Sequence, residues 1–361
     1  MDRTTRFAQA PAWLARLVLL VFVALVVYGY FSGYQLLTEV KSASGSTRRG
    51  DIYMYQAVIE RLRHGENYYA AANAELRSGG YALRPFFNWR LPTTAWLLSR
   101  FPNDMIGQRL FQLLTLATFG LWIWAFWRDT QSKLKVVVGS LLLLGALILA
   151  IVGSTIYFHE SWSALAIAAS LALYRPERWL GSVLLGVLAL LFRELALVYV
   201  VVMFGAALLE GRRREAIGWG IGLAVFAVLL AIHAIIVAGF VTDADRAKSW
   251  LAGNGWSFVL STAQWNGFIA LLPGWVVPLL VPLALIGAAA WRSALGLRIG
   301  LVLAAYCGAF MLVGNADNLY WGIMYAPLLS LGLLHAVSGL RDLVRAATRT
   351  QALPQPSGQQ L

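Results

Sequence analysis

The sequence has few charged residues and a single cysteine. Charged side chains make up 13% of the 361 residues and hydrophobic ones 59%, whereas soluble domains are about 25% charged and about 45–50% apolar. This composition excludes an ordinary soluble domain. Cys307 lies within an apolar run, which excludes an intrachain disulfide and a CxxC metal site. The four histidines lack the spacing of metal ligands, so we expect no metal site.

Apolar runs near the roughly 20 residues that cross a bilayer recur along the chain. A membrane β-barrel would instead show alternating segments of roughly ten residues. We therefore predict an all-α, polytopic membrane protein with about ten transmembrane helices. The first run is longer than the roughly 7–15 residues of a signal peptide's apolar region, which favours a retained signal anchor. The predicted spans are residues 13–37, 106–127, 136–158, 161–174, 179–192, 195–209, 216–240, 274–291, 299–313 and 319–338.

The net charge of +12 has a topological explanation. Basic residues collect in cytoplasmic loops of membrane proteins, and here they follow every even-numbered span. We therefore predict both termini in the cytoplasm, a multi-pass protein of the cytoplasmic (inner) membrane, and no nucleic-acid partner. Residues 1–349 would form one transmembrane domain, with residues 38–105 as the first outer loop and 241–273 as another. The Pro- and Gln-rich residues 350–361 are predicted to be a disordered cytoplasmic tail.

Three consecutive spans, at 161–174, 179–192 and 195–209, are too short for a bilayer core. Helices of 14 or 15 residues reach only about 21–23 Å, against a core of about 30 Å. The junction Arg193–Glu194 would therefore lie at membrane depth. Short segments with polar breaks are tolerated where they are buried in protein or line a watery cavity.

The longest polar interruption runs from Arg48 to Pro92. Apolar residues with helical spacing predict an amphipathic helix over 52–64, lying on the outer face of the bilayer. Asp51 stands directly before this helix. It is either a helix N-cap, for which aspartate is favoured, or a functional carboxylate that faces a cavity. Both roles are compatible.

Many arginines fall in predicted outer segments, against the usual charge bias. One interpretation is that they extend to the lipid interface beside aromatic residues. The other is that one or two of them bind an anionic phosphate through paired hydrogen bonds. Arg84 and Arg90, in the run RPFFNWRLP, are the candidates in the first outer loop.

The first 215 residues resemble the GT-C superfamily of membrane glycosyltransferases. The match lies in an aspartate soon after the first span, then an amphipathic helix, a Gly-x-Asn-x-Tyr motif and a proline-flanked aromatic run. The segment from His159 to Arg214 resembles the downstream half of that pattern. The first-loop residues of the match are Asp51, Tyr55, Gly65, Asn67, Tyr69, Pro85 and Pro92.

The resemblance implies an inverting, mannosyltransferase-like enzyme. It would transfer a sugar from a polyprenyl-phosphate donor to a lipid, glycan or protein acceptor outside the cytoplasmic membrane. Asp51 would be the catalytic base, and Arg193 the best match for the basic residue on the donor phosphate. No cofactor is implied, and the lone aspartate argues against a metal-dependent version. The remaining predicted site residues are Arg84 and Arg90 on the phosphate, and Tyr55, His159, Glu160 and Glu194 in the substrate cavity.

Other interpretations stay open. Arg193 and Glu194 can form an ion pair that joins two helix ends, and His159 with Glu160 can be an ordinary outer turn. In place of an enzyme, the chain can be a transporter or flippase of a lipid-linked glycan or an anionic substrate, or a non-catalytic assembly subunit. Transporters often contain inverted repeats, and we find no internal repeat in this sequence.

Overall fold

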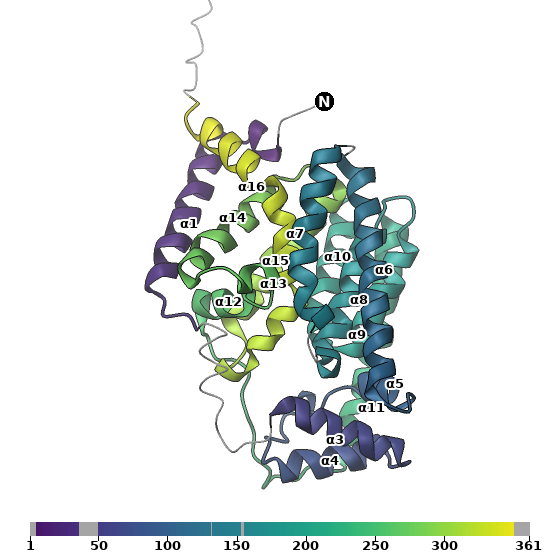
Figure 1. Cartoon of the computed structure of the whole chain (residues 1–361). Coiled ribbons are helices and arrows are strands. Elements are labelled where there is room, and N and C mark those ends of the chain that lie inside the picture. Colours follow the sequence, from purple (N-terminus) through teal and green to yellow (C-terminus); the bar gives the residue numbers. More distant parts are fainter. Residues whose placement is uncertain (1–4, 36–49, 131, 153–154, 350–361) are drawn as a thin grey trace, which may run out of the picture.

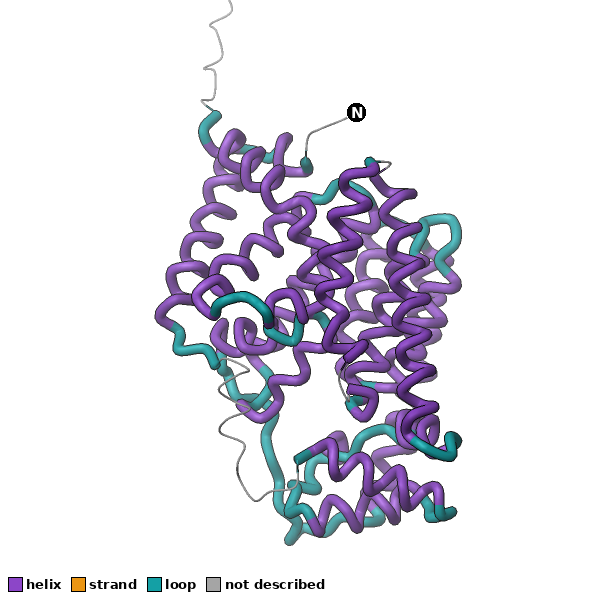
Figure 2. Tube along the Cα trace, viewed as in Figure 1, coloured by secondary structure: helices purple, strands orange, loops and turns teal. Residues whose placement is uncertain are grey.

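The structure is a computed structural model that describes residues 5–35, 50–130, 132–152 and 155–349 (Figure 1). Within these ranges every regular element is a helix, and the only extended pairing consists of two isolated bridges (Figure 2). The all-α prediction is therefore confirmed. The predicted tail, residues 350–361, lies outside the described ranges.

Six helices are long and apolar enough to cross a membrane, which supports a polytopic membrane protein. The number of crossings stays a prediction, because several of the expected spans are short. The six are α1 (Ala12–Phe31), α6 (Asp104–Thr130), α7 (Lys133–Val152), α11 (Arg213–Ala238), α15 (Ala294–Leu312) and α16 (Ala326–Ala347). The shorter helices of the bundle are α8 (His159–Leu173), α9 (Leu180–Phe192), α10 (Leu197–Leu209) and α14 (Val277–Ala290).

The helices form two groups that lie side by side in Figure 1. Helices α1, α14 and α16 make one group, and α6 to α10 make the other. In the first group α14 and α16 approach backbone to backbone. A Cβ atom on Gly287 would lie 2.0 Å from the Gly332 carbonyl oxygen, and one on Gly332 would lie 2.1 Å from that of Ala284. Small residues at a helix crossing allow this close contact.

The two described chain ends meet at one end of the bundle (Figure 1). The Thr5 backbone N–H donates to Asp342 Oδ2 at 2.9 Å, and Arg16 Nε donates to the Ala347 carbonyl at 2.9 Å. The side of the membrane on which the termini lie stays a prediction.

The predicted span at 319–338 is wrong in its bounds. The 3₁₀ segment η6 (Ala316–Met324) contains a non-helical Asn318, and α16 begins only at Ala326. Pro327 falls in the first turn of α16, where its missing N–H leaves no hydrogen bond unmade. The proline thus sets the start of α16, which continues to Ala347.

The predicted outer loop 241–273 is also wrong in part, because its second half folds back into the protein. It forms α12 (Gly255–Ala263) and the short α13 (Gly267–Ala270). Asn266 is fully buried between them. Its Oδ1 accepts two backbone N–H groups of α13, and its Nδ2 donates to the Ala326 carbonyl at 2.8 Å. These bonds satisfy the polar groups of a buried turn.

The described part of the predicted first outer loop forms a layer of short helices at the opposite end of the bundle (Figure 1). The predicted amphipathic helix is present as α3 (Asp51–Arg63), and Gly65 follows it with a φ of 85° that suits a helix-ending glycine. The apolar face of α3 packs on α4 (Tyr68–Ser78) and α5 (Thr93–Ser99). The apolar stripe that predicted a helix lying on lipid is therefore covered by protein, and Val58 and Ile59 are buried.

Candidate functional site

A partly open cavity lies between this layer and the bundle, with a volume of about 80 Å³. Five parts of the chain form its walls: α3, α4, the segment 81–90, the loop at 248–250 and the 3₁₀ segment η6. The lining residues are Asp51, Met54, Tyr55, Leu76, Tyr81, Ala82, Asn88, Arg90, Lys248, Trp250, Asp317, Asn318 and Tyr320.

Asp51 is the first residue of α3, and Gly50 takes the N-cap position. The N-cap interpretation of Asp51 is therefore wrong. Its carboxylate is partly buried, and Oδ1 accepts a hydrogen bond of 3.0 Å from the Tyr81 hydroxyl. No ion pair holds it among the residues that the structure describes. A carboxylate at a helix N-terminus that keeps one oxygen free is available to accept a proton or a hydrogen bond.

Arg90 lines the same cavity and contacts only neutral groups in the described parts of the chain. Its Nε donates to the Tyr55 hydroxyl at 3.2 Å and its Nη2 to the Tyr320 hydroxyl at 3.3 Å. Its third partner is the Phe87 carbonyl, at 3.2 Å from Nη1. The Trp250 ring centroid lies 5.8 Å from its Cζ. A partly buried guanidinium without a counter-charge is suited to an anionic ligand.

Tyr55 stands between this cavity and a second, smaller one of about 20 Å³, which it also lines together with Arg90 and His159. Burial raises the pKa of Tyr55 to about 12, so the phenol is neutral and can donate a hydrogen bond at neutral pH. The rings of Tyr55 and His159 are in edge contact, with centroids 4.9 Å apart.

Arg193 is fully buried behind the cavity instead of lining it. Its Nε lies 2.6 Å from Glu160 Oε1, and its Nη1 pairs with Glu194. Its Cζ is 5.6 Å from the ring centroids of both Trp250 and Trp321, which lie over it. The geometry matches the ion-pair alternative, because two carboxylates already balance the charge of this guanidinium.

Unused hydrogen-bonding atoms remain around this ion pair. Glu160 Oε2, Arg193 Nη2 and both ring nitrogens of His159 are buried without a partner among the described residues. Buried polar groups are normally paired, so a cluster of unpaired ones behind a cavity marks a place that a ligand's polar groups or water can reach. His159 and Glu160 begin helix α8, which excludes the ordinary outer turn.

Arg84 lies outside the cavity lining and is partly exposed. Its Nη1 donates to the Asp243 carbonyl at 3.1 Å and lies 3.4 Å from the Asp243 carboxylate. Of the three predicted phosphate ligands, only Arg90 thus faces the cavity with its charge unbalanced.

Sequence reasoning did not place Lys248 and Asp317 in the site. Lys248 Nζ lies 2.7 Å from Asp317 Oδ2, and both residues line the cavity. They are 69 positions apart in the chain, so no local pattern links them. The available signal was their position in predicted outer loops, where polar residues have no topological explanation.

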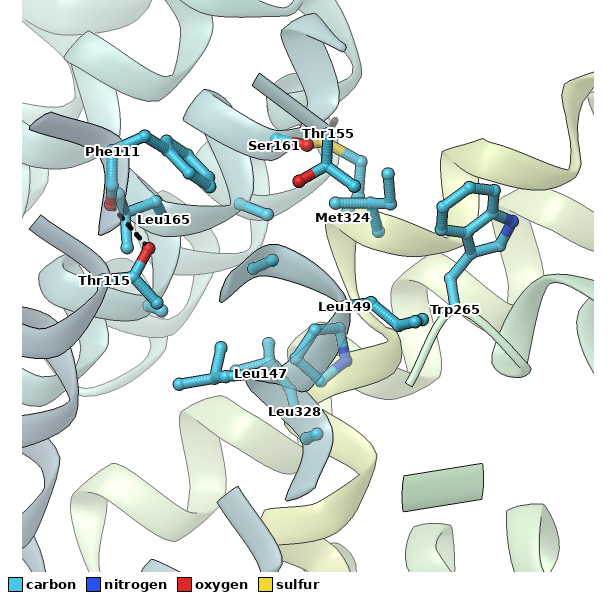
Figure 3. A pocket seen from close by; sticks show the side chains of 16 residues that line it. Phe111, Thr115, Leu147, Leu149, Thr155, Ser161, Leu165, Trp265, Met324 and Leu328 are labelled. Carbon is cyan, nitrogen blue, oxygen red and sulfur yellow. Dashed lines mark hydrogen bonds between the residues drawn. The ribbon is translucent and has the colours of Figure 1, made fainter. Parts of the chain in front are cut away.

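A third, apolar cavity of about 50 Å³ lies between α6, α7 and α8 on one side and η6 and α16 on the other (Figure 3). Figure 3 shows Thr155, Ser161 and Met324 near one another in its wall. The hydroxyls of Thr155 and Ser161 have no hydrogen-bond partner among the described residues. Phe158 separates this cavity from the polar one, since its ring contacts Trp265 of the first and Tyr320 of the second.

The charged groups of the site are arranged for binding an anion and accepting a proton. Within the described ranges, no group of three or more His, Cys, Asp or Glu residues has an arrangement that could hold a metal ion. Comparison with known proteins gives no relative: no family model, no curated protein and no solved structure matches this chain.

Proposed function

We propose that this chain is an inverting glycosyltransferase of the GT-C type, acting on the outer side of the cytoplasmic membrane. It transfers a sugar from a polyprenyl-phosphate donor to a hydroxyl of a lipid, glycan or protein acceptor. One observation carries the proposal: Asp51 and Arg90 line one cavity, and neither forms an ion pair with the described residues. A general base and a cation for a leaving phosphate are the two groups that this reaction requires.

In the proposed step, Asp51 accepts the proton of the acceptor hydroxyl while the oxygen attacks the anomeric carbon. The bond from that carbon to the phosphate oxygen breaks, and the lipid phosphate leaves with the electron pair. Arg90 balances the charge that develops on the phosphate, and the neutral Tyr55 phenol holds the Arg90 guanidinium. A single displacement inverts the configuration of the anomeric carbon.

The apolar cavity supports a lipid-linked substrate. It is lined mostly by aliphatic and aromatic side chains and is next to the polar cavity across Phe158. Within this proposal Arg193 positions the wall of the site through Trp250 and Trp321, and the donor phosphate contacts Arg90.

The test is turnover of purified Asp51→Asn with a lipid-linked sugar donor. The amide has the same shape but cannot accept the proton, so we expect turnover to fall by about 10²–10⁴-fold. Asp245→Asn removes a carboxylate outside the cavity lining and is the matched control, with turnover like the wild type. Wild-type turnover in Asp51→Asn would refute the proposed base.

Arg90→Gln is the second variant, and Arg84→Gln is its control. We expect Arg90→Gln to weaken donor binding and Arg84→Gln to leave it unchanged, because only Arg90 lines the cavity. A transporter would give a different result. Labelled lipid would then cross proteoliposome membranes without any covalent transfer of sugar.

A further inference from the structure

Two arginines share one tryptophan at the end of the bundle opposite the polar cavity. The Cζ atoms of Arg128 and Arg175 lie 4.5 Å and 4.4 Å from the ring centroid of Trp124. The two positive charges are therefore within about 9 Å of each other, a distance at which they still repel at physiological salt. Arg128 ends α6, and Arg175 lies in the turn between α8 and α9.

No carboxylate in the described parts of the chain forms an ion pair with either arginine. Arg128 Nη2 donates to the Tyr174 carbonyl at 3.1 Å, whereas its Nη1 is buried without a partner. The neighbouring Asp129 instead accepts a hydrogen bond of 2.7 Å from Trp291 Nε1. Two like charges and an unpaired buried donor thus surround one indole, which is an unfavourable arrangement without an anion.

The position favours a phosphate group of the membrane. Tryptophan and arginine are typical of the headgroup level of a bilayer, and Trp124 is 41% exposed. The planar guanidinium binds two phosphate oxygens at once. We propose that Arg128 and Arg175 form a binding site for a phosphate group, with the phosphodiester of an anionic phospholipid as the expected source.

This site is separate from the proposed catalytic cavity. The 27 residues of α6, at 1.5 Å each, place its two ends about 40 Å apart. The arginine pair lies at one end, and the layer of short helices packs near the other (Figure 1). The proposal therefore does not depend on the glycosyltransferase function.

The test measures binding of phosphatidylglycerol and phosphatidylcholine to the purified full chain by native mass spectrometry. The variant is Arg128→Gln/Arg175→Gln. Its control is Arg178→Gln/Arg345→Gln, which removes the same charge from two exposed arginines, one in the turn between α8 and α9 and one in the last turn of α16. We expect the Kd for phosphatidylglycerol to rise about 30-fold in the variant, on the scale of two arginines at an anionic surface. The control should bind like the wild type.

Competition with inorganic phosphate distinguishes the source. If millimolar phosphate displaces the lipid and itself binds in an arginine-dependent way, the site takes free phosphate. If it does not, the lipid headgroup is the ligand. The proposal fails if the wild type binds both lipids equally, or if the variant keeps its affinity for phosphatidylglycerol. Arg175→Gln alone repeats the test without altering the Arg128 hydrogen bond to Tyr174, in case the double variant folds poorly.

Discussion

Two buried arginines, Arg193 and Arg298, invite comparison because each is fully buried and paired with two glutamates. Arg193 contacts Glu160 and Glu194 at the start of the α9–α10 turn. Arg298 lies 2.8 Å from Glu210 and 3.3 Å from Glu215, where α10 ends and α11 begins. The two clusters thus occupy opposite ends of α10, with the same ionic groups.

The Arg298 cluster is almost fully hydrogen-bonded. Glu210 has a second cation, Arg212, at 2.7 Å, and Glu215 also accepts from Trp219 Nε1 at 3.4 Å. The Arg298 guanidinium lies over the ring of Tyr174, at 4.0 Å from the centroid. Of the polar side-chain atoms of these residues, only Arg298 Nε is buried without a partner among the described residues. This cluster joins α10, α11 and α15, and none of its charged residues lines the polar cavity.

The Arg193 cluster has the same charges but is incompletely paired, and it lies behind a cavity. Its unpaired atoms belong to Arg193, Glu160 and the neighbouring His159. The comparison teaches that a buried ion pair is not in itself a sign of function, since such pairs also serve packing. The unpaired atoms and the adjacent cavity distinguish the functional candidate.

Arg193→Met should have the largest effect on stability. It leaves the fully buried Glu160 without a counter-charge, and breaking a buried pair costs about 3–5 kcal/mol. Thermal unfolding in detergent measures the loss. A triple variant with Glu160→Gln and Glu194→Gln removes the unpaired charges, so stability should recover while transferase activity stays low. Recovered activity in the triple variant would make the Arg193 cluster purely structural.

Arg298→Met should destabilise the protein somewhat less than Arg193→Met, toward the lower end of the about 3–5 kcal/mol for a broken buried pair, because the buried Glu215 also loses its counter-charge. Glu210 keeps Arg212 as its counter-charge, and Glu215 keeps Trp219 as a hydrogen-bond donor. The activity of the molecules that remain folded should be unchanged. The same unfolding assay, with turnover normalised to folded protein, measures both effects. A loss of turnover at constant stability would remove the distinction between the two clusters.

Trp250→Phe should have a smaller effect on stability than the two arginine variants, because an aromatic ring stays between Arg90 and Arg193. The variant loses the hydrogen bond of 2.8 Å from Trp250 Nε1 to Asn88 Oδ1, which is worth about 1 kcal/mol. We expect KM for the donor to rise, since Trp250 and Asn88 line the cavity. Tyr174→Phe is the equivalent change beside Arg298, and its KM should be unchanged. Equal KM values in both variants would count against the cavity as the donor site.

Patterns in the sequence predicted those helices and helix ends that depend on neighbouring residues alone. Helical spacing identified α3, and the short apolar runs correctly placed the break at Arg193. The partners of these residues could not be predicted in the same way. Glu160 is 33 positions from Arg193, and Lys248 meets the α3 layer only through folding. Contacts between distant residues depend on how helices pack, which periodicity in one segment does not encode.

The exposed ion pair between Arg77 and Asp245 should contribute least to stability. It tests whether burial decides how much a paired arginine contributes. Arg77 lies 2.7 Å from Asp245 at the end of the bundle that carries the layer of short helices, and its hydrogen bond lowers the pKa of Asp245 from 3.8 to about 2. The pair therefore stabilises the folded state fully above a pH of about 4, and this contribution is lost as the pH falls toward 2.

Arg77→Gln should lower the unfolding temperature only slightly at neutral pH, because exposed pairs are screened by solvent. The difference from the wild type should shrink as the pH falls toward about 2, where Asp245 of the wild type is about half protonated. Thermal unfolding measured between pH 5 and pH 2 checks this. The control is Arg178→Gln, which removes an exposed arginine at the opposite end of the bundle. A loss as large as that of Arg193→Met would mean that pairing alone, without burial, sets the importance of these arginines, and the contrast between the two buried clusters would lose its physical basis.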